Sequence, residues 1–127
     1  MVVRDVPPVT EDVIERLRAV CLALPEAVEK PFSGHDQPAW RIRDKMFVMV
    51  ATGDGRLSFW CKALPGAQEV LAGSDPERFF VPPYVGSKGW IGMRLEVGGV
   101  NWGMVDELVC DSYRLIAPKK LAAQVMS

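Results

Sequence analysis

Residues 38–62, PAWRIRDKMFVMVATGDGRLSFWCK, decide the fold that we expect. Apolar and polar side chains alternate along most of this stretch, and a period of two is typical of half-buried β-strands. Asp44 tolerates the backbone of a tight turn, and Gly53-Asp54-Gly55 is a strong hairpin signal. The stretch therefore predicts an antiparallel meander of three strands, over residues 39–43, 45–52 and 56–62.

The same alternation assigns side chains to the two faces of each strand. In the second strand it places Met46 with Val48 and Val50, and Phe47 with Met49 on the opposite face. In the first strand it places Arg41 and Arg43 together on the polar face. A sheet with one apolar face needs helices to cover that face.

The residues before the meander predict one helix. Val13, Leu17, Val20 and Leu24 follow helical spacing, and Pro25 ends the pattern. Thr10 is expected to cap this helix, which leaves residues 1–9 as a loose leader. A short edge strand is expected over residues 27–32.

The residues after the meander predict further helices and one more long strand. Pro65 can open a short helix that ends at Gly73, and Asn101 can cap a longer one. Between them lie a brief apolar run, 79–81, and an alternating strand, 90–97; Pro118 can open a last turn. The whole chain, residues 1–127, is therefore expected to be one α+β domain. In it an antiparallel sheet is combined with an N-terminal helix, a short middle helix and C-terminal helices.

Composition narrows the class of protein. The 127 residues carry 15 basic and 16 acidic side chains, so a strongly basic surface overall is excluded. No apolar run approaches the ~20 residues that span a bilayer, and the N-terminus lacks the apolar stretch of a signal peptide. We therefore expect no membrane contact and a cytoplasmic location. The three widely spaced cysteines, Cys21, Cys61 and Cys110, are expected to be reduced thiols in the core.

Catalytic signatures are not found in the sequence. With His35 as the single histidine, a site with two or three histidine ligands cannot form within one chain. No glycine-rich phosphate loop is present. His35 could form a proton-transfer pair with Asp36, or a metal site with Glu29, but a histidine in a surface loop is the favoured interpretation. We therefore expect neither enzymatic activity, nor a metal, nor a cofactor.

Three segments resemble one known family. Residues 38–47 resemble the P-x-[FW]-R-V-R-x-K-x-F segment of the MmcQ/YjbR family, with Asp44 where glycine is expected. Residues 80–90, FVPPYVGSKGW, resemble its second hallmark. Residues 111–115, followed by 117–119, resemble its third. The resemblance implies a compact YjbR-like α+β fold, and DNA binding through a "double wing" of β-hairpins.

The distribution of charge is compatible with that function. Residues 37–62 hold five basic and two acidic side chains, although the whole chain has a net charge of −1. One interpretation is a set of phosphate contacts with DNA, weak and sensitive to salt. The other is the ordinary solvated face of a half-buried sheet. A nucleic-acid site would use Arg41, Arg43, Lys45, Arg56, Lys62, Lys88, Lys119 and Lys120.

A second hypothesis concerns the loop Pro82–Trp90. Tyr84, Lys88 and Trp90, with Arg114, offer flat apolar surfaces and cations for a small ligand or a protein partner. Alternatively the loop is a rigid proline and glycine corner with Trp90 in the core, and Arg114 forms an ion pair with Asp111 within a helix. A monomer is the default oligomeric state.

Overall fold

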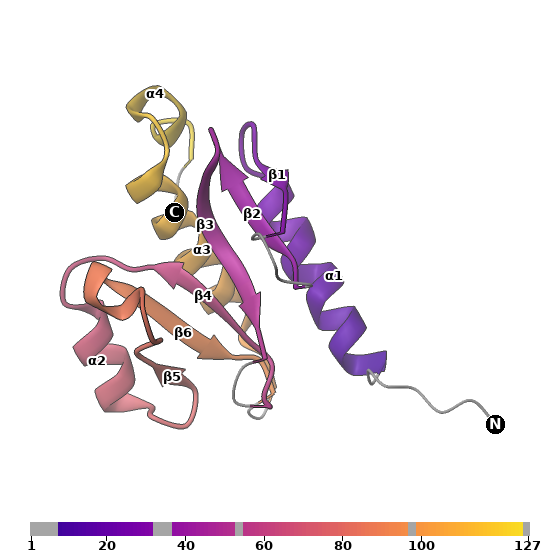
Figure 1. Cartoon of the computed structure of the whole chain (residues 1–127), viewed down its shortest axis with the longest axis vertical. Helices are drawn as coiled ribbons and strands as arrows, with labels where there is room; N and C mark the ends of the chain where they lie inside the picture. Colours follow the sequence, from indigo (N-terminus) through magenta and orange to yellow (C-terminus); the bar gives the residue numbers. More distant parts are fainter. Residues whose placement is uncertain (1–7, 32–36, 53–54, 97–98, 126–127) are drawn as a thin grey trace.

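The protein has a six-stranded antiparallel sheet with its two long helices packed on one side (Figure 1). The computed structural model describes residues 8–31, 37–52, 55–96 and 99–125 of the chain. The strands lie in the order β1-β2-β3-β4-β6-β5. Their bounds are Val28–Glu29 (β1), Ala39–Ile42 (β2), Lys45–Ala51 (β3), Ser58–Lys62 (β4), Phe79–Phe80 (β5) and Trp90–Arg94 (β6).

The helices are α1 (Pro8–Leu22), α2 (Ala67–Ser74), α3 (Trp102–Ile116) and α4 (Lys119–Ala122), with a 3-10 turn η1 at Gly86–Lys88. The expected α+β class, the three-strand meander and the order of helices are confirmed. The Asn101 cap is also confirmed, because its side-chain oxygen accepts a hydrogen bond from the Met104 amide at 3.1 Å. In the described residues, no helix is long and apolar enough to cross a membrane.

Several element bounds differ from the expectation; for example, β2 ends at Ile42 instead of residue 43, and β4 begins at Ser58 instead of residue 56. Helix α1 begins at Pro8, so Thr10 lies inside the helix instead of capping it. Proline suits a first helical position, because the amide that it lacks would have no partner there. Strand β1 has only two residues, and β6 ends at Arg94. The loose leader that we expected over residues 1–9 therefore overlaps α1, and residues 1–7 lie outside the described part of the chain.

The core lies between the sheet and the helices α1 and α3, which are seen behind the sheet in Figure 1. Leu17 of α1 and Val105 and Val109 of α3 are fully buried there. The thiol of Cys61 on β4 donates to the Leu108 carbonyl of α3 at 3.8 Å, which fixes the side of the sheet that α3 covers. We call this side the helix face and the other side the open face.

The three cysteines are free and buried, as expected. Burial raises the pKa of the Cys21 and Cys61 thiols well above the ordinary value. Thiolates are the reactive form of cysteine, so these two side chains behave as packing residues.

A β-bulge at Phe47 overturns one expectation about faces. Trp40 pairs with Val48, but the next residue, Arg41, pairs with Met46, so Phe47 is one extra residue on β3. The bulge turns Phe47 onto the helix face, where its ring meets Tyr113 edge-on at 5.4 Å. Met46 is turned away from Val48 and joins the open face. The predicted grouping of Met46 with Val48 and Val50 was therefore wrong.

Ser112 of α3 holds this bulge from the helix face. Its hydroxyl donates to the Phe47 carbonyl at 2.7 Å and accepts from the Lys62 amide at 2.9 Å. A bulge leaves ladder groups unpaired, and buried backbone groups need partners. One buried hydroxyl therefore supplies both partners and joins β3, β4 and α3.

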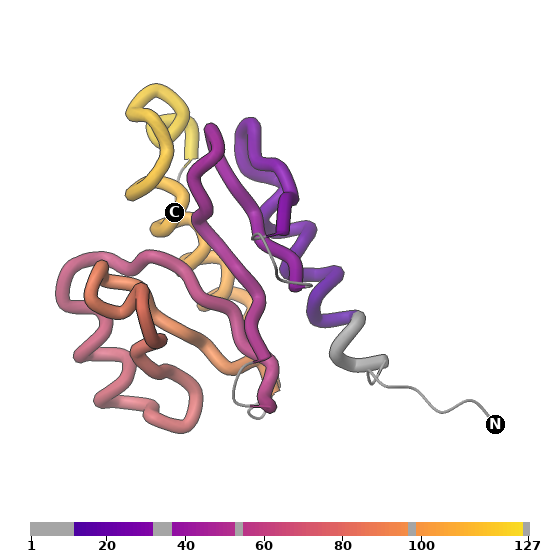
Figure 2. The backbone as a smooth tube through the Cα atoms, viewed as in Figure 1, coloured from indigo at the N-terminus to yellow at the C-terminus, as the bar shows by residue number. Residues whose placement is uncertain are grey.

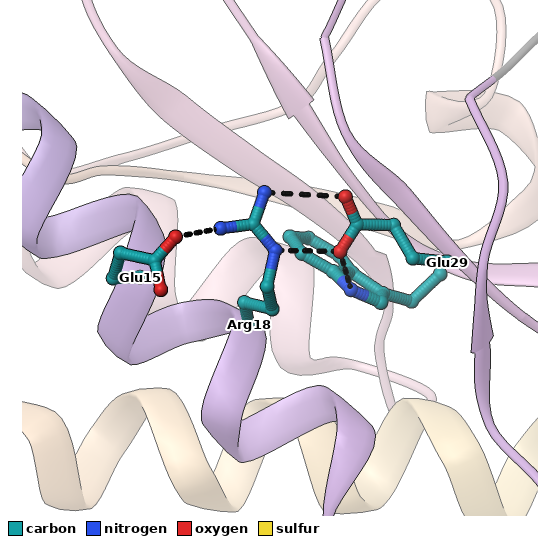
Figure 3. Close-up of polar contacts among 4 residues, drawn as sticks. Glu15, Arg18 and Glu29 are labelled. Carbon is teal, nitrogen blue, oxygen red and sulfur yellow. Dashed lines mark hydrogen bonds and ion pairs between the residues drawn. The ribbon is translucent and has the colours of Figure 1, made fainter.

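Helix α1 is joined to the sheet edge by a polar cluster (Figure 3). The Arg18 guanidinium donates to both carboxylate oxygens of Glu29 on β1, at 2.6 and 3.1 Å, and also contacts Glu15. The indole N–H of Trp40, a fully buried residue, donates to the same Glu29 at 3.1 Å. The Glu29 carboxylate accepts hydrogen bonds from the Arg18 guanidinium and from one core indole, so Glu29 has a structural role. The hydrogen bond with Glu29 also raises the pKa of Arg18.

Candidate functional site

The open face is defined by the pairing register. Alternation places on it Val28, Ala39, Arg41, Met46, Met49, Ala51, Ser58, Trp60, Lys62, Phe80, Trp90, Gly92 and Arg94. Three of these side chains are cationic and none is acidic. Glu29, the acidic residue of β1, is turned to the helix face by its hydrogen bond with Trp40. The described strands therefore give the open face a positive charge that the overall composition does not suggest.

Two of these cations flank the methionine that the bulge exposes. Arg41 pairs with Met46, and Lys62 follows Cys61, which pairs with Val48. Adjacent strands lie about 4.8 Å apart, so Arg41 on β2 and Lys62 on β4 start about 10 Å from each other. Arg41 donates only to backbone carbonyls, those of Lys30 and Asp44, both at 3.3 Å. Within the described residues, neither cation has a carboxylate partner.

An aromatic cluster lies beside them on β4, β5 and β6. The Phe80 ring lies directly over Gly92, where an added Cβ would be 2.3 Å from the ring. Trp60 meets this ring edge-on at 6.4 Å, and the Arg94 guanidinium lies 4.6 Å above it. The Trp60 Nε1 atom is buried and has no hydrogen-bond partner among the residues that the structure describes. Arg94 was not among the predicted site residues, although the alternation over 90–97 already separated it from Ile91 and Met93.

Arg43 departs from its predicted place. It is a turn residue between β2 and β3 and not a strand residue beside Arg41, because Arg43 and Asp44 both have positive φ, 50° and 68°. A two-residue hairpin of type I′ requires this conformation at both positions. The Arg43 guanidinium forms a double hydrogen bond with Glu26, at 2.7 and 3.2 Å, and this bond lowers the pKa of Glu26. Its charge is therefore compensated.

The other predicted cations are spread over the molecule. Lys45 is exposed at the start of β3, and Arg56 lies near the other end of this strand, where Ala51 pairs with Ser58. The six residues from Lys45 to Ala51 span roughly 20 Å, so the two cations are far apart. Arg56 has an interaction within the structure and is not free. Lys88 is exposed on η1, and Lys119 and Lys120 are exposed on α4, which packs against α3. The eight predicted residues thus include one pair, Arg41 and Lys62, that shares the open face.

The loop Pro82–Trp90 forms a fixed corner beside the sheet, grouped with α2 away from α1 (Figure 2). The Gln68 side-chain amide of α2 donates to the carbonyls of Gly86 and Trp90, both at 2.7 Å. Gly86 is buried against Val81, and Gly89 has a φ of 87°, which favours glycine. Trp90 is 7% exposed, so its predicted burial is confirmed. Gln68 was not predicted, since a glutamine gives no pattern that identifies its partners.

The remaining residues of the second hypothesis lie apart. Tyr84 is 91% exposed and has a φ of 66°, in the left-handed region that non-glycine residues seldom adopt. Arg114 forms the expected ion pair with Asp111, at 2.6 Å, and donates to the Val125 carbonyl at 3.4 Å. It therefore lies on the helix side near the C-terminal residues, whereas Tyr84 and Lys88 lie on the corner.

Metal binding gains no support from the described residues, which contain no group of three or more His, Cys, Asp or Glu side chains able to hold an ion. His35 and Asp36 lie outside the described part of the chain. Glu29, their suggested companion, is already bonded to Arg18 and Trp40.

These features define an α+β protein whose antiparallel sheet has one face packed by helices and one basic, partly aromatic face. A family model described as YjbR matches residues 22–115, so the chain belongs to the YjbR family. The crystal structure of Deinococcus radiodurans protein DR2400, with a DUF419 domain, has a similar fold. It has a TM-score of 0.71 and 22% identity, and the alignment covers 81% of this chain and 77% of that chain. A search of curated proteins found no match.

Proposed function

We propose that this protein binds nucleic acid, with phosphates contacted by basic side chains of the β2–β3–β4 meander, and that it has no catalytic activity. The observation that carries the proposal is the charge of the open face, where Arg41 and Lys62 lie among strand positions without an acidic side chain. Lys45, exposed at the adjoining hairpin end, adds a third cation. The buried free thiols favour a reducing compartment, so we infer that the protein acts in the cytoplasm; a monomer is the default oligomeric state.

Three cations set the strength of such binding. Each phosphate contact lowers the logarithm of the binding constant by about 0.9 per tenfold rise in salt for duplex DNA, and by about 0.7 for a single strand. Three contacts therefore give a slope of about −2 to −3. This is weak binding, best measured at low salt.

The test is a fluorescence-anisotropy titration of a labelled 20-nucleotide DNA, as a single strand and as a duplex. The variant R41Q/K45Q/K62Q removes three charges from the meander. The matched control, K88Q/K119Q/K120Q, removes three charges from η1 and α4. We expect the first variant to lose most of the affinity and the salt dependence, and the control to keep most of both. Equal binding by the two variants would remove the meander from the interface.

A second candidate function is a small-ligand or protein-interaction site on the corner, and Tyr84 favours it. An almost fully exposed aromatic ring on a left-handed backbone is an unusual arrangement, and such strain is concentrated at functional sites. Exposed Lys88, four residues later, adds a cation. Adding adenosine monophosphate as an anionic aromatic probe should shift the amide resonances of residues 84–90 in the wild type and not in Y84S. Shifts of equal size in both proteins would exclude Tyr84 from such a site.

A further inference from the structure

We propose that the open face is a platform for single-stranded nucleic acid, with unpaired bases against Trp60, Phe80 and Met49 and phosphates on Arg41 and Lys62. This inference rests on the proposed function and specifies which form of nucleic acid is bound.

The open face presents apolar side chains that the described elements leave partly uncovered, although Ala39, Ser58 and Trp90 on this face are buried. Met46, Met49, Trp60 and Phe80 are all neither buried nor fully exposed. Helices α1 and α3 lie on the other side of the sheet, and Figure 1 shows strands β2, β3 and β4 in front of them. A contiguous group of apolar side chains at a protein surface is typical of a binding site.

These side chains are arranged in rows across the strands. Pairing places Met49, Trp60 and Gly92 side by side on β3, β4 and β6, and Phe80 covers Gly92. The row spans about 10 Å between the outer strands. Some sheets that bind single-stranded RNA stack two or three bases on aromatic side chains. Arg41 pairs with Met46 in the adjoining row, and Lys62 lies one residue beyond the last β3–β4 pair, so cations follow this border of the apolar row.

The positive charge of the open face selects the kind of partner. The open face has three cationic strand positions and no acidic one among the described residues, which favours an anionic chain over an ordinary protein surface. The Arg94 guanidinium lies 4.6 Å from the centre of the Phe80 ring and covers one face of it, so it adds positive charge beside this ring. Stacking on aromatic rings combined with phosphate contacts is how single strands are held without sequence preference.

The position of the aromatic rings on a sheet favours unpaired bases over a duplex. Rings on a sheet reach only bases that are not already stacked inside a double helix. A hairpin that enters a duplex groove needs free cations at its tip, but Arg43 at the β2–β3 turn is bound to Glu26. The buried Trp60 N–H, which has no acceptor among the described residues, adds a donor that base oxygens or ring nitrogens can satisfy after a small shift of Phe80.

The experiment compares binding of a labelled twelve-nucleotide oligo(dT) with that of a twelve-base-pair duplex at low salt. We expect the wild type to prefer the single strand, and W60L to weaken that binding about 5- to 100-fold, as for loss of one stacked base. W60F keeps a ring and should recover much of the loss. W102L is the matched control, because Trp102 begins α3 and its ring lies under the Arg16 guanidinium at 4.6 Å, away from the open face.

Two readouts separate a direct contact from a folding defect. Oligo(dT) should quench tryptophan emission in the wild type and in W102L but not in W60F, while thermal unfolding shows that each variant is folded. R41Q/K62Q should lower the salt slope for the single strand by about 1.4, which corresponds to two contacts.

Three results would overturn the inference. Equal affinity for the two DNAs with no effect of W60L would reject the platform and leave the phosphate-binding function standing. Failure to bind either DNA would reject both. If W60L loses self-association or binding of a protein partner, and oligo(dT) does not compete with that binding in the wild type, the open face is a protein interface instead.

Discussion

Replacing Ser112 with alanine tests whether one hydroxyl holds the bulge that shapes the open face. Ser112 is fully buried and bonds both the Phe47 carbonyl, at 2.7 Å, and the Lys62 amide, at 2.9 Å. Alanine would leave both backbone groups without this partner, and each unsatisfied buried group costs about 1–3 kcal/mol. Since the Lys62 bond is only partly buried, we expect S112A to lower the free energy of unfolding by about 2–4 kcal/mol.

Urea unfolding followed by circular dichroism measures this change, and the midpoint of thermal unfolding should fall by about 8–16 °C for a domain of this size. The matched control is S74A, because exposed Ser74 makes one 3.3 Å bond to the Leu71 carbonyl and should change stability by less than about 0.5 kcal/mol. A loss in S112A no larger than that in S74A would refute the reasoning. Amide exchange should also accelerate at Phe47 and Lys62 if the bulge loosens.

Three further predictions concern other contacts. Arg43 lowers the pKa of Glu26 below its ordinary 4.5, so this pair stabilises the fold above that pH, and the contribution is lost as the pH falls. As the pH falls from 5 to 3, the free energy of unfolding should therefore decrease less in E26Q than in the wild type. An equal decrease in the two proteins, measured by urea unfolding, would contradict this. G92A would drive a Cβ to 2.3 Å from Phe80, so we expect a destabilisation of about 1–3 kcal/mol and a changed near-ultraviolet spectrum; a wild-type midpoint would show that the ring moves freely. Q68A removes two 2.7 Å bonds from the corner and should cost about 1–3 kcal/mol, with faster amide exchange confined to residues 86–90. Unchanged exchange there would mean that the proline and glycine backbone fixes the corner alone.

Part of the candidate site was predictable from local pattern. The alternation around Trp60 and Arg94 places both on the side opposite Phe59 and Met93, and the register confirms that grouping. The intrahelical pair of Asp111 and Arg114 also follows from spacing, since residues three apart lie on one side of a helix. Such features depend on the period of one element, and the period is written in the sequence.

The pairing of charges was not predictable in the same way. Arg43 and Glu26 are separated by 17 residues, and no period links a turn residue to the end of another loop. The two become neighbours because β1 lies beside β2, which brings the chain after α1 next to the β2–β3 hairpin. A count of basic residues therefore overstated the free charge of the meander.

The sequence by itself determined the α+β class, the meander and the segments that mark the YjbR family, because apolar periodicity and turn residues act within each element. Tertiary structure alone decided which faces of β3 Met46 and Phe47 occupy. The Phe47 bulge depends on a hydroxyl 65 positions away, on Ser112, and a single extra residue reverses the alternation beyond it. That reversal places Met46 beside Arg41 on the surface to which we assign the binding of single-stranded nucleic acid.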